Sequence, residues 1–463
     1  MWIDASIVII FLAASLFIGI KSSKHIVDFD RFSVGHRAFS SAAIFATLSA
    51  SFIGGGYTLG NAAKVYQAGM LYAFALLGFS LKEILVALII APRMDAYRDC
   101  LSIGDIIAKR YGNGAKVVTG LFSVLVCTGI LGAQVGAMTA IFGTFFTINP
   151  LWATLVSFAI IIIYSSLGGM RAVVYTDILQ FCVLVIGIPL TLIMGLIHFG
   201  GWQPIAQRVP HEYLYFWKGH DHLSLFIGLF ITFIFGEALV PPYVQRLFMA
   251  KTARATRNGV LASGILSIPF FLIAGAIGLI AFALNPHINS NSALPYVVKM
   301  ILPIGVKGFV IAGLVAIIMS SAAGFLNAAS VAFVNDIVKP LSRSAWRPNT
   351  LLRLAKGSTL FVGIGALVFA LSINNVLDIL LYAYNFWAPI IIVPLVAVIF
   401  NFSVKAQDFF IGACCGIGAM LIWSLMLHSP FEINGLVIGV VGNLIGFMLS
   451  KPFQKQKNAR GAC

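Results

Sequence analysis

Residues 46–60 read Ala-Thr-Leu-Ser-Ala-Ser-Phe-Ile-Gly-Gly-Gly-Tyr-Thr-Leu-Gly, a hydrophobic run that three consecutive glycines interrupt. Glycine destabilises a helix and permits backbone angles that are closed to other residues. Unwound backbone cannot face lipid, because its carbonyl and amide groups would have no hydrogen-bond partner there. A helix that ends at Ile53 would present the freed carbonyls of Ala50 and Ile53, which are suitable ligands for a small cation. The alternative is that the glycines merely allow close helix packing.

Composition indicates an integral membrane protein. The 463 residues are 60% hydrophobic and 10% charged, with a mean hydropathy of +0.99. Apolar runs of about 20 residues mark membrane-spanning helices, and such runs occupy nearly the whole chain. The first run carries Asp4 and lacks a basic leader or a small-residue cleavage site, so we do not expect a signal peptide. The six cysteines have no metal-like spacing and are expected to pack.

We predict an all-α fold with thirteen transmembrane spans and no separate soluble domain. The predicted spans are 5–21, 38–63, 68–92, 114–146, 150–167, 174–199, 222–249, 258–284, 297–338, 354–372, 376–402, 407–427 and 432–450.

The basic residues predict the orientation in the membrane. Of the 30 Lys and Arg, only Lys64, Arg208, Lys218, Lys299 and Lys307 lie on the side of the loops that follow even-numbered spans. Most of the others lie in the loops after odd-numbered spans, around Arg171 and in the C-terminal tail. The positive-inside rule therefore predicts an external N-terminus and a cytoplasmic C-terminus in the plasma (inner) membrane. The net charge of +15 is then a topology signal and gives no reason to expect a nucleic-acid partner.

A second predicted span is also interrupted. It reads Gly236-Glu-Ala-Leu-Val-Pro-Pro242, and the tandem prolines remove two amide donors and break the helix. The two broken spans are five spans apart, so they enter the membrane from opposite sides. Paired broken helices in inverted repeats point to a transporter's central site. We therefore predict one transporter domain over 1–463, with repeats over 38–199 and 222–402, followed by two extra helices and a short tail over 403–463.

A pair of serines completes a possible cation site. The hydroxyls of Ser320 and Ser321 and the carbonyl of Ile317 share one helix face. With the carbonyls of Ala50 and Ile53 they offer five neutral oxygens, which suit a monovalent cation. The alternative is that the serine hydroxyls bond back to the preceding turn of their own helix.

Several motifs resemble those of the sodium:solute symporter family over essentially the whole chain. They are residues 50–60, Gly168-Gly-Met-Arg-Ala-Val-Val-Tyr-Thr-Asp177, Tyr243-Val-Gln-Arg246 and Met319-Ser-Ser-Ala-Ala-Gly-Phe-Leu-Asn327. The resemblance implies a leucine-transporter-like fold of inverted five-helix repeats and sodium-coupled transport. Residues 46–60 are most similar to the choline-carrier branch, although the second break lacks that branch's tryptophan.

The resemblance also implies roles for individual residues. The family's main sodium site falls on the five oxygens already named, and Asp177 matches an acidic position at the inner end of the sodium pathway. The family often has Asp-Ser where this chain has Ala323 and Gly324. This departure predicts one sodium ion per cycle, without a second site.

Charged residues within spans are the best indication of the solute, because a charge in lipid needs a partner or a cavity. One alternative is an ion pair of Lys82 with Glu237 or Glu83. The other is contact of one of them with a charged or zwitterionic solute. Since Lys82 and Glu83 are adjacent, we expect them to point about 100° apart and not to face one neighbour. The candidate solute-binding residues are Gly54, Gly55, Gly56, Tyr57, Lys82, Glu83, Glu237, Tyr382, Tyr384, Asn385 and Trp387.

The sequence thus predicts a sodium-coupled symporter for a small polar organic solute such as an amino acid or a betaine- or choline-like compound. It predicts no enzymatic activity, with sodium as the transported ion and with solute and membrane lipids as partners of a monomer or loose oligomer. The alternatives are a proton-coupled or sodium-independent transporter of the same fold and a membrane solute sensor.

Overall fold

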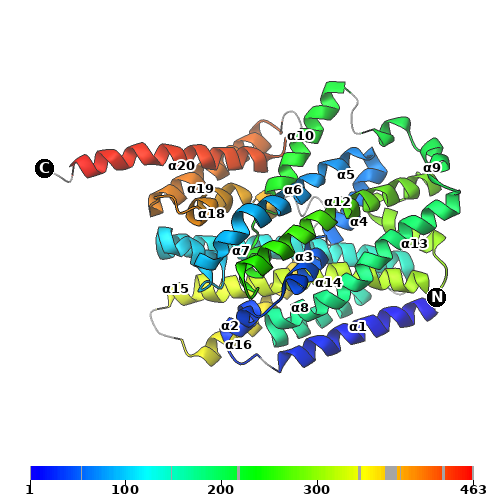
Figure 1. Cartoon of the computed structure of the whole chain (residues 1–463), viewed down its shortest axis with the longest axis horizontal. Helices are drawn as coiled ribbons and strands as arrows, with labels where there is room; N and C mark the ends of the chain where they lie inside the picture. Colours follow the sequence, from blue (N-terminus) through cyan, green and yellow to red (C-terminus); the bar gives the residue numbers. More distant parts are fainter. Residues whose placement is uncertain are drawn as a thin grey trace.

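The structure is a computed structural model, and it confirms an all-α architecture (Figure 1). It describes residues 2–24, 26–53, 55–146, 149–215, 219–342, 346–370, 383–385, 387–429 and 433–460; for 55, 150, 219–222, 369–370 and 451–460 it describes the backbone alone. Within these ranges the one β contact is an isolated bridge between Phe39 and Ala250.

The first half of the chain forms the helices up to the second break. In chain order they are α1 (Trp2–Ser23), α2 (Phe29–Val34), η1 (Gly35–Arg37), α3 (Ser41–Phe52), α4 (Gly55–Ala68), α5 (Leu71–Ala75), α6 (Leu77–Leu85), η2 (Val86–Ile90), η3 (Ala91–Tyr97), α7 (Ile103–Phe145), α8 (Pro150–Phe199), α9 (Trp202–Arg208), η4 (His211–Leu214) and α10 (Gly219–Phe235).

The second half continues from that break to the C-terminal helix. It comprises α11 (Pro241–Phe248), α12 (Ala253–Leu284), η5 (Ser290–Ser292), α13 (Ala293–Ile301), α14 (Val306–Ala332), η6 (Phe333–Val338), α15 (Lys339–Leu341), α16 (Pro348–Ala370), α18 (Ala388–Ile399), α19 (Ala406–Leu421), η7 (Ile422–Met426) and α20 (Gly435–Arg460).

Helix α14 is the centre of the molecule. It packs against α1, α3, α7, α8 and α16, and nearly all of its side chains are buried (Figure 1). A helix that is apolar all round can be stable only when other helices or lipid cover every face. Because α14 also carries Ser320 and Ser321, the polar groups of this helix must find partners within the protein.

Eight helices of the described residues are long and apolar enough to span a membrane, or nine when the bent pair α3–α4 is one span. Three shorter apolar helices, Leu223–Phe235, Ala388–Ile399 and Gly435–Ser450, fall within further predicted spans. The number thirteen stays a prediction. The predicted span 297–338 is wrong as one helix, since α13 ends at Ile301 and α14 begins after Gly305, whose φ is +89°.

Helix α8 contains two predicted spans and reverses direction within its length. Tyr164 and Asp177 both contact the middle of α14, at Met319 and Ser320. In a straight helix, residues thirteen apart would be separated by about 20 Å. The reversal occurs at Gly169, where φ is +50° and ψ is −150°. The predicted reversal between spans 150–167 and 174–199 is therefore present, but the loop around Arg171 is shorter than predicted, because helix resumes directly after this single glycine.

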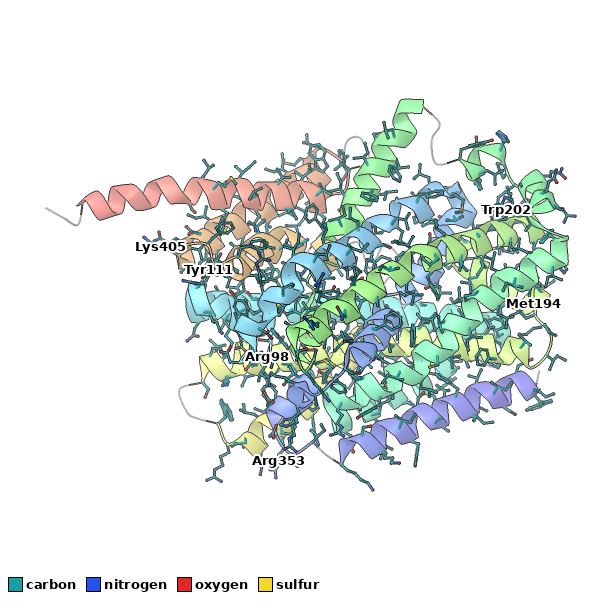
Figure 2. The ribbon with its side chains drawn as sticks, viewed as in Figure 1. Arg98, Tyr111, Met194, Trp202, Arg353 and Lys405 are labelled. Carbon is teal, nitrogen blue, oxygen red and sulfur yellow. The ribbon has the colours of Figure 1, made fainter. Side chains whose placement is uncertain are left out.

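The two ends of the molecule differ in the labelled residues that lie toward them. Helix α1 begins at one end of the long axis and α20 extends toward the other (Figure 1). Figure 2 shows Arg98, Arg353 and Lys405 toward the end to which α20 extends, and Trp202 toward the opposite end. These three basic residues, all assigned to the cytoplasm, thus lie toward the same end of the helix bundle, and the orientation in the membrane stays a prediction.

Candidate functional site

Both predicted helix breaks are present. Helix α3 ends at Phe52, and the chain bends by 43° before α4 continues. The central glycine of the break, Gly54, lies outside the described residues. Helix α10 ends at Phe235, and α11 begins at Pro241 with prolines at its first two positions. Between them Leu239 adopts a φ of +51°, so this segment is non-helical backbone in the protein interior.

A small cavity lies between the two breaks. It has a volume of about 10 Å³ and is lined by Ser51, Gly56, Tyr57, Ile130, Gln134, Glu237, Ser321, Phe325 and Tyr384. The lining comes from both broken helices and from α7, α14 and the segment before α18. Solute pockets commonly occupy about 300–1,000 Å³, so an organic solute would need the two broken helices to move apart before it could bind here.

The two predicted cation-site serines face the first break. Ser321 Oγ donates to the Ser51 carbonyl at 2.6 Å, and Ser320 Oγ donates to Asp177 Oδ1 at 2.6 Å. A hydroxyl has one hydrogen to donate, so neither serine bonds back to its own helix. The back-bonding alternative is therefore wrong. Ala50 and Ile53 flank the Ser51–Phe52 pair at the end of α3, and Ile317 lies one turn before the serines; all three are buried.

A ring of buried hydrogen bonds joins these serines to Arg246. The guanidinium donates through Nη2 to Ser51 Oγ at 2.5 Å and to Asp177 Oδ2 at 3.1 Å. Ser51 Oγ lies 2.8 Å from Ser320 Oγ, which closes the ring through Asp177. Nε of Arg246 also donates to Thr47 Oγ1 at 3.0 Å. Asp177 thus contacts the cation-site residues directly, and an arginine neutralises its charge.

Gly324 makes room for this arginine. A Cβ atom at position 324 would lie 2.8 Å from Arg246 Nη2 and 3.0 Å from Nη1. Any larger residue there would displace the fully buried guanidinium. The sequence departure at Gly324 therefore coincides with the position of a fixed positive charge.

Lys82 and Glu83 form a buried ion pair, with Lys82 Nζ 2.7 Å from Glu83 Oε1. Of the two ion pairs expected for Lys82, this is the one present. Our expectation that they cannot face one neighbour is wrong, because both contact Tyr243. Lys82 Nζ lies 4.9 Å from the centroid of that ring, and the Tyr243 hydroxyl donates to Glu83 Oε2 at 2.9 Å. Long side chains can curve back toward one another although their Cβ atoms diverge.

Comparison with known proteins identifies the family. The model of the sodium:solute symporter family matches residues 32–416. The chain belongs to this family. Sodium/proline symporter 2 of Staphylococcus saprophyticus is 26% identical, over 97% of this chain and 91% of its own length. The human sodium/iodide cotransporter is 27% identical over 73% of this chain, but the match spans only 55% of the human protein.

The fold of this symporter family member is also that of solved transporters. A sodium-coupled sialic acid symporter in a substrate-bound, outward-open state superimposes with a TM-score of 0.84 at 22% identity, covering 97% of this chain and 98% of that one. The closed nucleobase-cation transporter Mhp1 gives a TM-score of 0.60 at 12% identity. Both share the leucine-transporter-like fold, and the relatives are membrane transporters, not enzymes.

The remaining solute-binding predictions for the symporter separate into two groups. Gly56, Tyr57, Glu237 and Tyr384 line the cavity between the breaks, and their contact with a solute stays a prediction. The lining does not include Lys82, Glu83, Asn385 or Trp387, and Gly55 is described by its backbone alone. Trp387 instead donates from Nε1 to the Ala238 carbonyl at 3.2 Å, which supports the second break from behind. Tyr382 lies outside the described residues.

Sequence reasoning missed several residues of the symporter's site. Ser51, Thr47 and Gln134 were not singled out, and Arg246 was noted only within a motif. Ser51 offered a signal, because it is a hydroxyl within the broken span. Gln134 offered a weaker one as an uncharged polar residue in a long apolar run.

A larger cleft of about 420 Å³ lies elsewhere, between α1, α7 and α8. Its lining is apolar apart from Ser157, and it includes the exposed side chains of Trp2 and Trp152. It contains neither helix break and no charged group, so its surface suits lipid chains better than a polar solute.

Proposed function

We propose that this protein is a sodium-coupled symporter that imports a small polar organic solute by alternating access. The observation that carries the proposal is the cavity between the two breaks, whose lining includes both Ser51 and Ser321. A solute in this cavity would lie against the serine cluster that faces the first break. Binding of the solute and binding of the cation therefore depend on the same helix positions.

Sodium is assigned to the carbonyls of Ala50, Ile53 and Ile317 and to the hydroxyls of Ser320 and Ser321. Bound there, the ion would hold the end of α3 against the middle of α14. These five neutral oxygens would stabilise a monovalent cation, and no carboxylate is among the assigned ligands. Asp177, whose charge Arg246 balances, accepts from Ser320 Oγ at 2.6 Å and would orient that hydroxyl on the side toward which the ion would leave.

Transport requires the two broken helices to change their packing around this site. Sodium stabilises the arrangement in which α3 and α14 are joined, and the solute then occupies the cavity. Opening of the inner side separates α3 from α14 and releases both. We place the N-terminus outside and the C-terminus in the cytoplasm, since Arg98, Arg353 and Lys405 lie toward one end of the bundle (Figure 2).

The test is replacement of both serines, Ser320→Ala with Ser321→Ala. Thermal unfolding of the purified protein is measured in NaCl and in KCl at equal ionic strength. The wild type is expected to gain stability in NaCl with a saturable sodium dependence. The double variant is expected to need at least about tenfold more sodium, which corresponds to about 1.4 kcal/mol.

A matched control is the double variant Ser330→Ala with Ser358→Ala. Ser330 lies on the same helix, and its hydroxyl lies 2.9 Å from that of Ser358, away from the site. This variant should lose stability equally in both salts and keep its sodium affinity. An unchanged sodium affinity in the Ser320/Ser321 variant would overturn the site assignment.

A proton-coupled cycle is the second candidate, and the buried Glu237 favours it. In that case stabilisation by solute would be independent of sodium and would require acidic pH. Solute binding that depends on NaCl at constant pH would exclude it.

A further inference from the structure

Glu237 is the unusual group of the cavity. It lies in the non-helical segment between α10 and α11, and only 3% of its surface is exposed. Its Oε2 atom has no hydrogen-bond partner, although it lines the space between the two breaks. Burial of a carboxylate oxygen without a partner is costly, and such exceptions in native proteins call for an explanation such as a ligand.

The nearby buried cations already have carboxylate partners. Lys82 is 2.7 Å from Glu83, and Arg246 is 3.1 Å from Asp177. Within the part of the chain that the structure describes, no Lys, Arg or His nitrogen lies within ion-pair distance of Glu237. Glu237 is therefore the one charged residue among those that line the cavity, and no cation of the described residues forms an ion pair with it.

We infer that the transported solute carries a primary or secondary ammonium group, which donates N–H hydrogen bonds to Glu237. This inference rests on the proposed symport function and names the chemistry of its solute. A charge-assisted bond between an ammonium and a carboxylate is among the strongest available in a dry site. Gln134 adds a second buried acceptor in the lining, since its Oε1 also has no partner.

The aromatic residues argue against a quaternary ammonium. A quaternary cation has no N–H group and is bound by open faces of aromatic rings. The Tyr57 ring, however, already packs against Phe79, Phe233 and Phe271, with centroids 5.1–6.1 Å apart. Its hydroxyl lies 3.2 Å from that of Tyr384. The two tyrosines thus bring polar edges together in the cavity and do not form an aromatic cage.

The cavity also lacks the features that would recognise an anionic head group at the second break. Both buried cations nearby are paired, and helix α11 begins with Pro241 and Pro242. A helix N-terminus binds anions through its free amide N–H groups, and proline has none. The group that faces Glu237 is therefore cationic.

The experiment compares solutes that differ only in N-methylation. The pairs are ethanolamine and choline, glycine and glycine betaine, and proline and N,N-dimethylproline, with glucose and iodide as uncharged and anionic probes. Thermal stabilisation of the full-length protein is measured for each in NaCl and in KCl. We expect stabilisation in NaCl by at least one N–H member, and at least about tenfold weaker binding of its fully methylated partner.

Two variants assign the effect to Glu237. Glu237→Gln keeps the shape of the side chain and should weaken binding of the N–H solute at least about tenfold while sodium affinity is kept. Glu212→Gln, in η4 and outside the cavity lining, makes the same change and should leave solute binding unaltered. If Glu237→Gln proves unstable, Glu237→Asp, which keeps the charge but shortens the side chain, should show reduced affinity with the same preference for N–H solutes.

Stabilisation only by a fully methylated, uncharged or anionic solute would overturn the inference, as would a silent panel of N–H solutes. Either result leaves the proposed function intact if sodium alone still stabilises the protein. Loss of the sodium effect in the wild type would instead overturn the proposed function.

Discussion

Lys82 and Glu83 are a buried ion pair whose two partners depend on each other. Both side chains are almost fully buried, at 3% and 0% exposure, and Tyr243 contacts both. Removal of one partner leaves an uncompensated charge in the membrane interior, which typically costs about 3–5 kcal/mol. We therefore expect Glu83→Gln to lower the thermal unfolding temperature substantially, as measured on the purified protein.

The double variant Lys82→Met with Glu83→Gln separates charge from packing. Replacement of both partners by uncharged side chains of similar size is often neutral, because desolvation of the pair offsets its attraction. The double variant should recover most of the lost stability. A double variant as unstable as the single one would show that packing around Tyr243, and not the unpaired lysine, sets the cost.

At the scale of helices, local chemistry explains what sequence could predict. Two prolines at 241–242 cannot continue a helix, so the second break was predictable without its surroundings. Contacts between segments that are distant in the sequence were not predictable in this way. Ser51 and Ser320 are 269 positions apart, and their contact depends on how α3 and α14 rotate about their axes. The reversal between the predicted spans 150–167 and 174–199 was expected, but its length was not, since one residue, Gly169, makes the turn and leaves no polar loop in the sequence.

Gly169 provides a test of that turn. Its φ and ψ of +50° and −150° belong to a region that only glycine occupies readily, and a Cβ would lie 2.6 Å from the Phe32 carbonyl oxygen. Gly169→Ala should therefore destabilise the protein through both backbone strain and a clash, by more than about 1–3 kcal/mol. The readout is the thermal unfolding temperature, or recovery of folded protein after extraction.

Gly200 offers the matched control. It has a φ of +75° in the left-handed region, but a Cβ there would meet nothing within 4 Å. Gly200→Ala should thus show only the strain of a left-handed residue, about 1–2 kcal/mol. Equal effects at both glycines would contradict the proposed contact between the α8 turn and α2.

For the whole molecule, the shared lining of the cavity predicts how tightly sodium and solute are coupled. Ser51 and Ser321 belong both to the cavity and to the hydrogen bonds that join α3 to α14. Each ligand should therefore favour the same packing of the broken helices, and the coupling is reciprocal at equilibrium. Once a solute is found, saturating sodium should tighten solute binding by about 5–150-fold, and saturating solute should tighten sodium binding by the same factor.

Ser321→Ala removes the hydrogen bond to the Ser51 carbonyl and should reduce both factors together, as measured by titration calorimetry. If Ser321→Ala weakened sodium binding but left the coupling factor unchanged, the two ligands would communicate by a route other than the contact between α3 and α14.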